Sequence, residues 1–274
     1  MKIGKWIKEA MQKPGTGKPE TMTEDKPEEM TVEAKEKKER EEMKDVNVTK
    51  EMPVKKGNQD LMEVVFIIDR SGSMSGLEAD TIGGFNSTLE KQKQESCKTL
   101  WSTVLFDDRH EVVHDRLPID QVKPLDTDTY YVRGMTALLD AIGRAIHHVR
   151  NIHKYARPED VPGKTLFVIT TDGMENASRE YTYAKVRQMI EREKEKYGWE
   201  FMFLGANMDA VDVAGRMGID RSRAATFIND DIGIRKNYEA VSGAMKCMAQ
   251  AGYIPDQALE EVRKDYAKRS RKRW

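Results

Sequence analysis

The apolar run from Val64 to Ile68, which ends abruptly in a polar turn, constrains the fold of this chain more than any other feature. An uninterrupted run of this length is typical of a strand that is buried on both faces, as strands of parallel sheets are. Asp69, Ser71 and Ser73 follow it directly in the segment D-R-S-G-S, before a helical pattern begins. The sequence therefore predicts a parallel strand that delivers oxygen-bearing side chains to the edge of a sheet.

The rest of the chain alternates between strand-like and helix-like patterns. Further strands are predicted at 100–106, 166–170, 199–204 and 224–228, and an alternating segment at 111–116 predicts an antiparallel edge strand. Helices are predicted at 78–94, 134–149, 180–196, 209–217 and 238–251. This alternation favours an α/β fold with a doubly wound, mostly parallel sheet and helices on both faces.

Three loops are expected to meet at one crevice of this sheet. With the first strand at the centre, the strand order changes direction between residues 64–68 and 166–170, where open α/β sheets bind their ligands. Thr136 at a helix start and Asp172 after a strand would join Asp69, Ser71 and Ser73 there. Two carboxylates and three hydroxyls suit Mg²⁺, or Mn²⁺ in its place. The neutral hydroxyls would leave the ion able to attract a carboxylate from another molecule.

These loops resemble a known family. The segments D-R-S-G-S at 69–73, G-M-T-A-L-L-D-A-I at 134–142 and T-T-D-G at 170–173 are similar to the metal-ion-dependent adhesion site (MIDAS) of von Willebrand factor type A (vWA) domains. The resemblance implies a six-stranded, Rossmann-like vWA fold with an intact MIDAS. It assigns Ser71, Ser73 and Thr136 as hydroxyl ligands, while Asp69 and Asp172 coordinate directly or through water.

The resemblance also implies a class of partner. The prokaryotic intracellular members that it resembles often act in multiprotein assemblies, sometimes alongside AAA+ ATPases. A protein partner that supplies an Asp or Glu to the metal is therefore expected. For any one of the five residues taken alone, a simpler interpretation exists, because Asp, Ser and Thr after a strand often cap the next helix.

The domain organisation follows from composition. Residues 1–13 are predicted to form an amphipathic basic helix. Such a helix either docks on an anionic membrane or in a partner groove, or is a frayed terminal helix that touches its own domain. Residues 14–58 are rich in Lys, Glu, Thr and Pro and predict a charged flexible linker. Residues 59–252 form the predicted vWA domain, and residues 253–274 a basic C-terminal helix or tail.

Charge, cysteine content and the lack of long apolar stretches indicate the class of partner and the cellular compartment. A net charge of -1 argues against nucleic acid as a partner, and two distant cysteines predict reduced thiols. With no apolar stretch of membrane-spanning length, the expected location is cytoplasmic, with peripheral membrane association through residues 1–13.

Three functions are compatible with these patterns. The leading hypothesis is a non-enzymatic interaction module that binds an acidic residue of a partner through bound Mg²⁺. The first alternative is a Mg²⁺-dependent phosphohydrolase that uses Asp69, although Ser71 stands where such an enzyme has a second carboxylate. The second is a structural vWA domain that binds through its terminal helices.

Overall fold

Strand β1 (Asn58–Asp69) lies at the centre of a six-stranded sheet with the strand order β3-β2-β1-β4-β5-β6. The computed structural model describes residues 57–271. β1 pairs in parallel with β2 and β4, and only β3 is antiparallel, on β2. The other strands are β2 (Lys98–Phe106), β3 (His110–Pro118), β4 (Pro162–Thr171), β5 (Glu200–Ala206) and β6 (Ala224–Phe227). The predicted fold class, a mostly parallel six-stranded sheet with one antiparallel edge strand, is confirmed.

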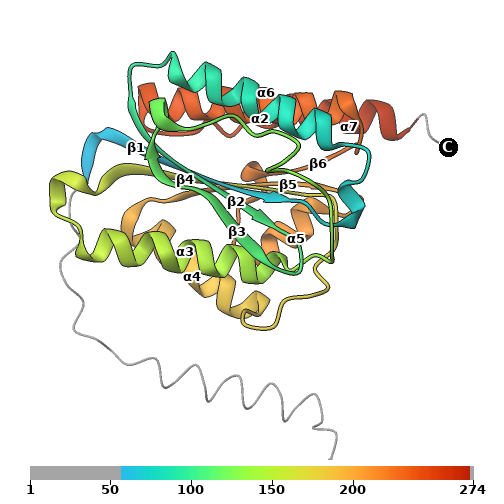
Figure 1. Ribbon diagram of the computed structural model, residues 1–274, viewed down its shortest axis with the longest axis horizontal. Coiled ribbons are helices and arrows are strands. Elements are labelled where there is room, and N and C mark those ends of the chain that lie inside the picture. The colour runs from blue at the N-terminus through green and yellow to red at the C-terminus, as the bar shows by residue number, and fades with distance from the viewer. Residues whose placement is uncertain (1–56, 272–274) are drawn as a thin grey trace, which may run out of the picture. The chain divides into compact units, whose positions relative to one another are not determined.

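Helices cover both faces of the sheet (Figure 1). On one side lie α2 (Glu78–Lys93), α6 (Asp231–Ala251) and α7 (Glu260–Ser270), and on the other α3 (Leu138–Tyr155), α4 (Tyr183–Tyr197) and α5 (Ala210–Arg216). Short 3-10 turns occupy Gly72–Met74, Ile119–Gln121, Pro158–Asp160 and Arg221–Arg223. Across residues 57–271, no helix combines the length and the apolar character needed to span a bilayer. The predicted helix at 1–13 and most of the predicted linker at 14–58 lie outside the described residues.

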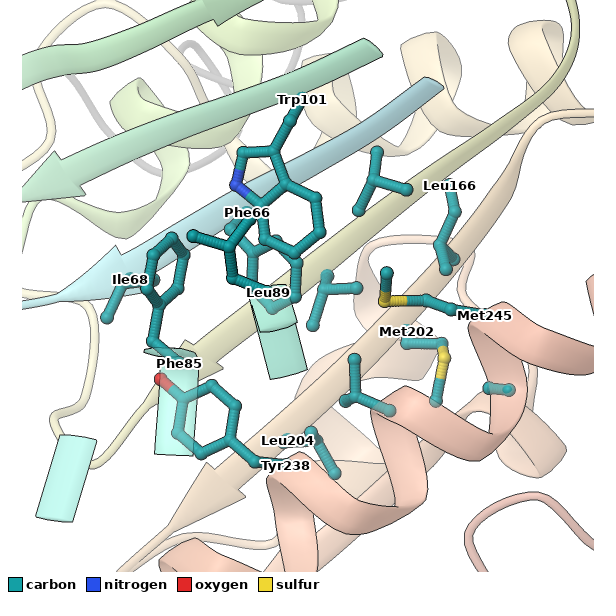
Figure 2. Close-up of a cluster of buried hydrophobic side chains, with 14 of the residues drawn as sticks. Phe66, Ile68, Phe85, Leu89, Trp101, Leu166, Met202, Leu204, Tyr238 and Met245 are labelled. Carbon is teal, nitrogen blue, oxygen red and sulfur yellow. The ribbon is translucent and has the colours of Figure 1, made fainter. Parts of the chain in front are cut away.

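The side chains of β1 alternate between two cores from Val64 to Ile68, which explains why the sequence is apolar at each of these five positions. Phe66 belongs to the core under α2 and α6, whereas Val65 and Ile67 belong to the core under α3, α4 and α5. Figure 2 shows the first core, where the Phe66 ring stacks on Trp101 with centroids 4.8 Å apart. A strand that is buried on both faces can contain no polar alternation, so the continuous apolar run is a consequence of its central position.

The direction of chain growth reverses between β1 and β4. The chain passes from β1 to β2 and β3 on one side, and then returns to place β4 against the other side of β1. Ile68 pairs with Thr170 in this register, so both strands end at the same level. The loops after β1 and β4 therefore start next to each other, as the predicted position of the crevice requires.

Four helix starts differ from the sequence prediction, and α3 begins at Leu138 rather than 134 and α5 at Ala210 rather than 209. α6 begins at Asp231 rather than 238, because Asp230 caps it by accepting a hydrogen bond from the Gly233 backbone NH at 2.9 Å. α4 begins at Tyr183 rather than 180, with Thr182 as its cap. For α6 and α4 the cap residue, and not the first apolar position, sets the boundary.

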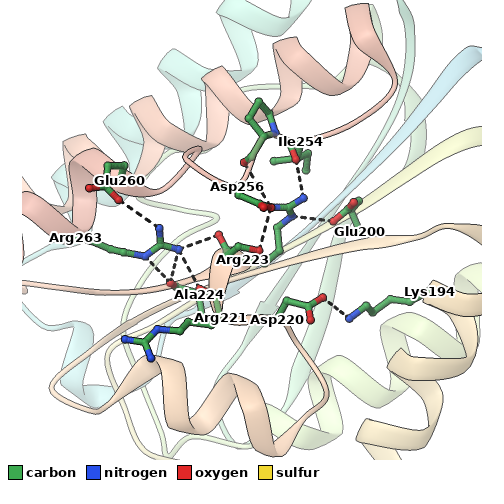
Figure 3. Close-up of polar contacts among 12 residues, drawn as sticks. Lys194, Glu200, Asp220, Arg221, Arg223, Ala224, Ile254, Asp256, Glu260 and Arg263 are labelled. Atoms are coloured by element: carbon green, nitrogen blue, oxygen red, sulfur yellow. Dashed lines mark hydrogen bonds and ion pairs between the residues drawn. The ribbon is translucent and has the colours of Figure 1, made fainter.

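The folded unit continues beyond residue 252, which was the predicted end of the domain. The side chains of Ile254, Leu259 and Val262 are buried in the core under α2 and α6. Arg263 on α7 donates hydrogen bonds to the backbone oxygens of Ser222, at 2.8 Å, and Ala224, at 3.1 Å (Figure 3). Residues 253–271 are therefore part of the same packed structure and not a detached basic tail, while residues 272–274 lie outside the described range.

Leu259→Ala should lower the free energy of unfolding by about 2–5 kcal/mol, because Leu259 is 0% exposed and its removal leaves a cavity. Urea denaturation followed by circular dichroism measures this change. Tyr253→Ala is the control, because Tyr253 is 60% exposed and its loss should change stability by less than about 0.5 kcal/mol. Equal stability of the two variants would show that α7 is not part of the cooperative core.

Candidate metal site

The three hydroxyl residues predicted as metal ligands lie in contact at the carboxyl edge of the sheet. Thr136 Oγ1 donates a hydrogen bond to Ser71 Oγ at 3.0 Å, and Ser71 Oγ lies 3.1 Å from Ser73 Oγ. Gly173, the neighbour of Asp172, packs so closely that a Cβ atom there would lie 2.6 Å from Thr136 Oγ1 and 3.0 Å from Ser73 Oγ. The loops after β1 and β4 and the loop before α3 thus converge as predicted, and glycine is required at 173.

Both carboxylates at this edge are buried, and neutral groups satisfy them incompletely. Asp69 Oδ1 accepts a hydrogen bond from the Ser71 backbone NH at 2.7 Å, and Asp69 Oδ2 accepts one from Thr171 Oγ1 at 2.6 Å. Asp172 Oδ2 accepts one from the Asn229 amide at 2.7 Å. Asp172 Oδ1 is buried and has no hydrogen-bond partner among residues 57–271. A buried carboxylate oxygen without a donor is costly unless a cation or water meets it.

Burial shifts the ionisation of both groups in the same direction. Desolvation raises the pKa of Asp69 to about 6, and the hydrogen bonds from Thr171 and Ser71 offset only part of this shift. Desolvation also raises the pKa of Asp172, against the opposing effect of the nearby Ser73 hydroxyl and Asn229 amide. Ionised carboxylates in this position need a positive charge, and a divalent cation would supply it.

The donor set fits a hard cation. It consists of two carboxylates and three hydroxyls, and the part of the chain that the structure describes places no group of three or more His, Cys, Asp or Glu side chains to hold a metal. Oxygen-only donors favour Mg²⁺ or Mn²⁺ over metals that prefer imidazole or thiolate. The buried Asp172 Oδ1 and the close approach of Gly173 are the structural features that support this fit.

Backbone hydrogen bonds hold the three loops in register. The Gly72 NH donates to the Gly134 oxygen at 3.1 Å, and the Arg133 NH donates to the Arg70 oxygen at 2.9 Å. The Asn176 NH donates to the Thr136 oxygen at 3.0 Å. Each loop is therefore fixed to another at the positions beside the predicted ligands, which is the preorganisation that a metal site needs.

The capping interpretation of Thr136 is wrong. The N-cap of α3 is Ala137, and its side chain makes no capping bond. Glu175 performs this role from the third loop, because its Oε2 accepts a hydrogen bond from the Leu139 NH at 2.9 Å. The Thr136 hydroxyl is thereby left to face Ser71.

Arg70 follows Asp69 in sequence but directs its charge to another carboxylate. Its side chain is fully buried, and Nε lies 2.9 Å from Asp107 Oδ2. Arg133 Nε contacts the same oxygen at 2.6 Å. Burial opposes ionisation of Asp107, but hydrogen bonds from Arg133, the Arg109 backbone and Arg70 outweigh it, so the pKa of Asp107 lies below its usual range. The Arg70 guanidinium therefore pairs with Asp107. Its positive charge does not compensate the negative charge of Asp69.

Sequence reasoning missed three residues that support the site, namely Thr171, Asn229 and Asp107. Thr171 stands inside the quoted T-T-D-G segment, and Asn229 follows the last predicted strand, so strand-end position was an available signal for both. Asp107 follows the second strand in the same way. What the sequence could not supply is which strand ends are neighbours in space.

Comparisons with known proteins support no assignment to a family by sequence. No protein-family model matches the chain, and no curated protein matches it. Structural comparison finds similarity to proximal thread matrix protein 1 from the mussel byssus with a zinc-occupied MIDAS motif, at 15% identity and a TM-score of 0.46, covering 69% of this chain and 46% of that one.

Two further solved structures are similar to a comparable degree. A von Willebrand factor type A structure from Catenulispora acidiphila is 14% identical, with a TM-score of 0.44, and the match covers 69% of this chain and 43% of that one. The ArnB paralog VWA2 from Sulfolobus acidocaldarius is 14% identical, with a TM-score of 0.45, over 69% of this chain and 46% of that one. The matched region thus spans less than half of each of these three structures.

Asp69→Asn should stabilise the metal-free protein at neutral pH. The folded-state pKa of Asp69, about 6, exceeds the unfolded value of about 3.9, so the folded state binds the proton more tightly and loses stability as pH rises through this window. Asn can accept from the Ser71 NH and donate to Thr171 Oγ1, whose own hydrogen can still reach the Gly173 oxygen.

Thermal unfolding in EDTA measures this effect. The variant should be more stable than wild type by on the order of 1–3 kcal/mol at pH 7.5, and the difference should shrink towards pH 4. A variant that is less stable at both pH values would contradict the description of Asp69 as an uncompensated buried charge.

Proposed function

We propose that this chain is a vWA-type module that binds a protein partner through a divalent cation and performs no bond-breaking chemistry. Asp69, Ser71, Ser73, Thr136 and Asp172 would hold the cation. The observation that carries the proposal is Asp172 Oδ1, a buried carboxylate oxygen without a hydrogen-bond donor, beside three hydroxyls that contact one another. Capping alone does not explain this arrangement.

The composition of the ligand set favours binding over catalysis. Mg²⁺, with Mn²⁺ as a substitute, suits these oxygens, and when bound it supplies a site of positive charge that a carboxylate from a partner can complete. Two carboxylates balance a divalent charge only when both are ionised and both coordinate. The three neutral hydroxyls contribute ligand atoms without further negative charge, so the attraction for an external Asp or Glu is retained.

The phosphohydrolase alternative has less support. Asp69 would be its nucleophile, yet both carboxylate oxygens of Asp69 already accept hydrogen bonds, from the Ser71 NH and from Thr171 Oγ1. Ser71 occupies the position where a second carboxylate is expected, and its hydroxyl contacts Thr136. The second carboxylate of the cluster is Asp172, which comes from another loop and whose Oδ2 already accepts a hydrogen bond from the Asn229 amide.

The class of partner and the cellular location of this interaction are also part of the proposal. The partner would supply an Asp or Glu within a multiprotein assembly, with AAA+ ATPase-containing assemblies as the first class to examine. A cytoplasmic location, with peripheral membrane or partner docking by residues 1–13, completes it. Binding through terminal helices is less favoured for α7, because Arg263 and the buried Val262 engage it with β6 and the core.

Thr136→Val should weaken Mg²⁺ and Mn²⁺ binding at least about tenfold while preserving the fold, because it removes one ligand oxygen and keeps a branched side chain of similar size. Isothermal titration calorimetry with each metal measures the affinity. Thr165→Val is the matched control, because Thr165 is buried on β4 and its hydroxyl has no hydrogen-bond partner among residues 57–271. Equal metal affinity in both variants would remove Thr136 from the site.

Partner binding should require the metal and the same hydroxyl. Immobilised wild-type protein and the immobilised Thr165→Val variant should both retain the partner protein in MgCl₂ and release it in EDTA. The immobilised Thr136→Val variant should retain little of the partner protein in either buffer. Quantitative mass spectrometry of the bound fractions measures recovery. Partner recovery that is indifferent to EDTA and to Thr136→Val sinks the proposal. Phosphate release from a phosphomonoester that disappears in Asp69→Asn would instead favour the hydrolase.

A further inference from the structure

The loops that hold the predicted metal ligands also carry exposed apolar side chains. Met135 immediately precedes Thr136 and is 54% exposed, and Met174 follows Gly173 and is 67% exposed. Thr136 and Gly173 are themselves in contact, as the 2.6 Å distance from Thr136 Oγ1 to the Cβ position of Gly173 shows. Two exposed methionines are therefore attached to the backbone directly beside the oxygen cluster, and we refer to Met135 and Met174 as the apolar rim.

The charged residues next to the apolar rim are occupied by contacts within the protein. Glu175 follows Met174, and its carboxylate accepts hydrogen bonds from the Leu139 NH at 2.9 Å and the Ser178 NH at 2.8 Å. Arg133 precedes the rim by two residues, and its Nε lies 2.6 Å from Asp107 Oδ2. Glu175 and Arg133 are thus engaged within the protein, so the exposed side chains that these two loops offer a partner beside the cluster include Met135 and Met174.

A groove with a mixed polar and apolar lining begins at the same site. It has a volume of about 690 Å³ and lies at the carboxyl ends of β5 and β6 beside α7. Its volume is within the range of about 300–1,000 Å³ that binding clefts occupy. Asn229 lines this groove and also donates the hydrogen bond to Asp172 Oδ2, so the groove and the predicted metal site share a residue. Its apolar lining residues are Met208, Phe227, Ile228 and Tyr266, and polar residues, among them the exposed Asp209, line the rest of it.

We infer that the partner presents its acidic residue between large apolar side chains, which contact the apolar rim on one flank and enter the groove on the other. This inference rests on the proposed metal-dependent binding of a carboxylate. Methionine adapts to differently shaped apolar surfaces, and apolar contacts that exclude water strengthen the charged contact at their centre.

Synthetic peptides with a central Asp test this inference on the full-length protein. Three labelled peptides carry Leu and Met, Ser, or Lys at the flanking positions, and fluorescence anisotropy in MgCl₂ gives each Kd. The Leu/Met peptide should bind at least about tenfold more tightly than the Ser peptide, a difference within the reach of a few buried side chains. A central Asp→Asn peptide and EDTA report the metal-dependent part of the binding.

Variants of the rim and groove identify the surface responsible. The double variant Met135→Ser/Met174→Ser and, separately, Tyr266→Ser should each reduce the advantage of the Leu/Met peptide several-fold while leaving Mg²⁺ affinity unchanged. Tyr155→Ser is the matched control, because Tyr155 is also exposed but lies at the far end of α3. It should change neither quantity.

The outcomes separate the inference from the proposed function. Mg²⁺-dependent binding of all three peptides with equal affinity, or tighter binding of the Lys peptide, would overturn the inference alone. The same holds if the Leu/Met advantage survives in the rim and groove variants. Absence of any Mg²⁺-dependent, Asp-dependent binding would overturn the proposed function, and this inference with it.

Discussion

The carboxylates of Asp69 and Asp172 are buried side by side on neighbouring loops, and no cationic side chain within residues 57–271 forms an ion pair with either of them. The organisation of the site depends on this uncompensated negative charge. Their hydrogen bonds come from neutral donors, namely the Ser71 NH, the Thr171 hydroxyl and the Asn229 amide. Burial therefore raises the pKa of both groups. Folding must hold these oxygens together against their own repulsion, and the hydrogen bonds between loops provide that restraint.

The placement of Arg70 shows how the fold keeps the charge uncompensated. A guanidinium one residue from Asp69 could neutralise it, but the loop directs Arg70 to Asp107, which Arg133 also contacts. Both guanidinium groups lie 5.3 Å from the centre of the Tyr131 ring, which further fixes their orientation. This arrangement stabilises the loops that carry Arg70 and Arg133. It does not neutralise the negative charge of the oxygen cluster, which a cation from solution would have to compensate.

The fold and the proximity of the five candidate ligands could be predicted because both follow from local patterns and one topological rule. Val64–Ile68 is apolar throughout because β1 is central, and residues after parallel strands meet at one edge. The direction of Arg70 and the bond from Asn229 to Asp172 depend on contacts between segments distant in sequence, which periodicity does not encode. α7 was missed as part of the core because its polar sequence buries few residues, among them Val262.

The two edges of the sheet are protected in different ways. At the β6 edge, the Arg263 guanidinium on α7 donates a hydrogen bond to the Ala224 backbone oxygen. α7 therefore covers the edge at which another strand could pair with β6. On β3, Arg116 adopts a left-handed backbone conformation with φ of 49°, and the pairing with β2 is irregular there. Charged Glu111 and Asp115 lie along the same strand. Bulges and charges of this kind disfavour edge-to-edge pairing. The molecule can therefore be concentrated in a large assembly with little tendency to extend its sheet into a neighbouring copy.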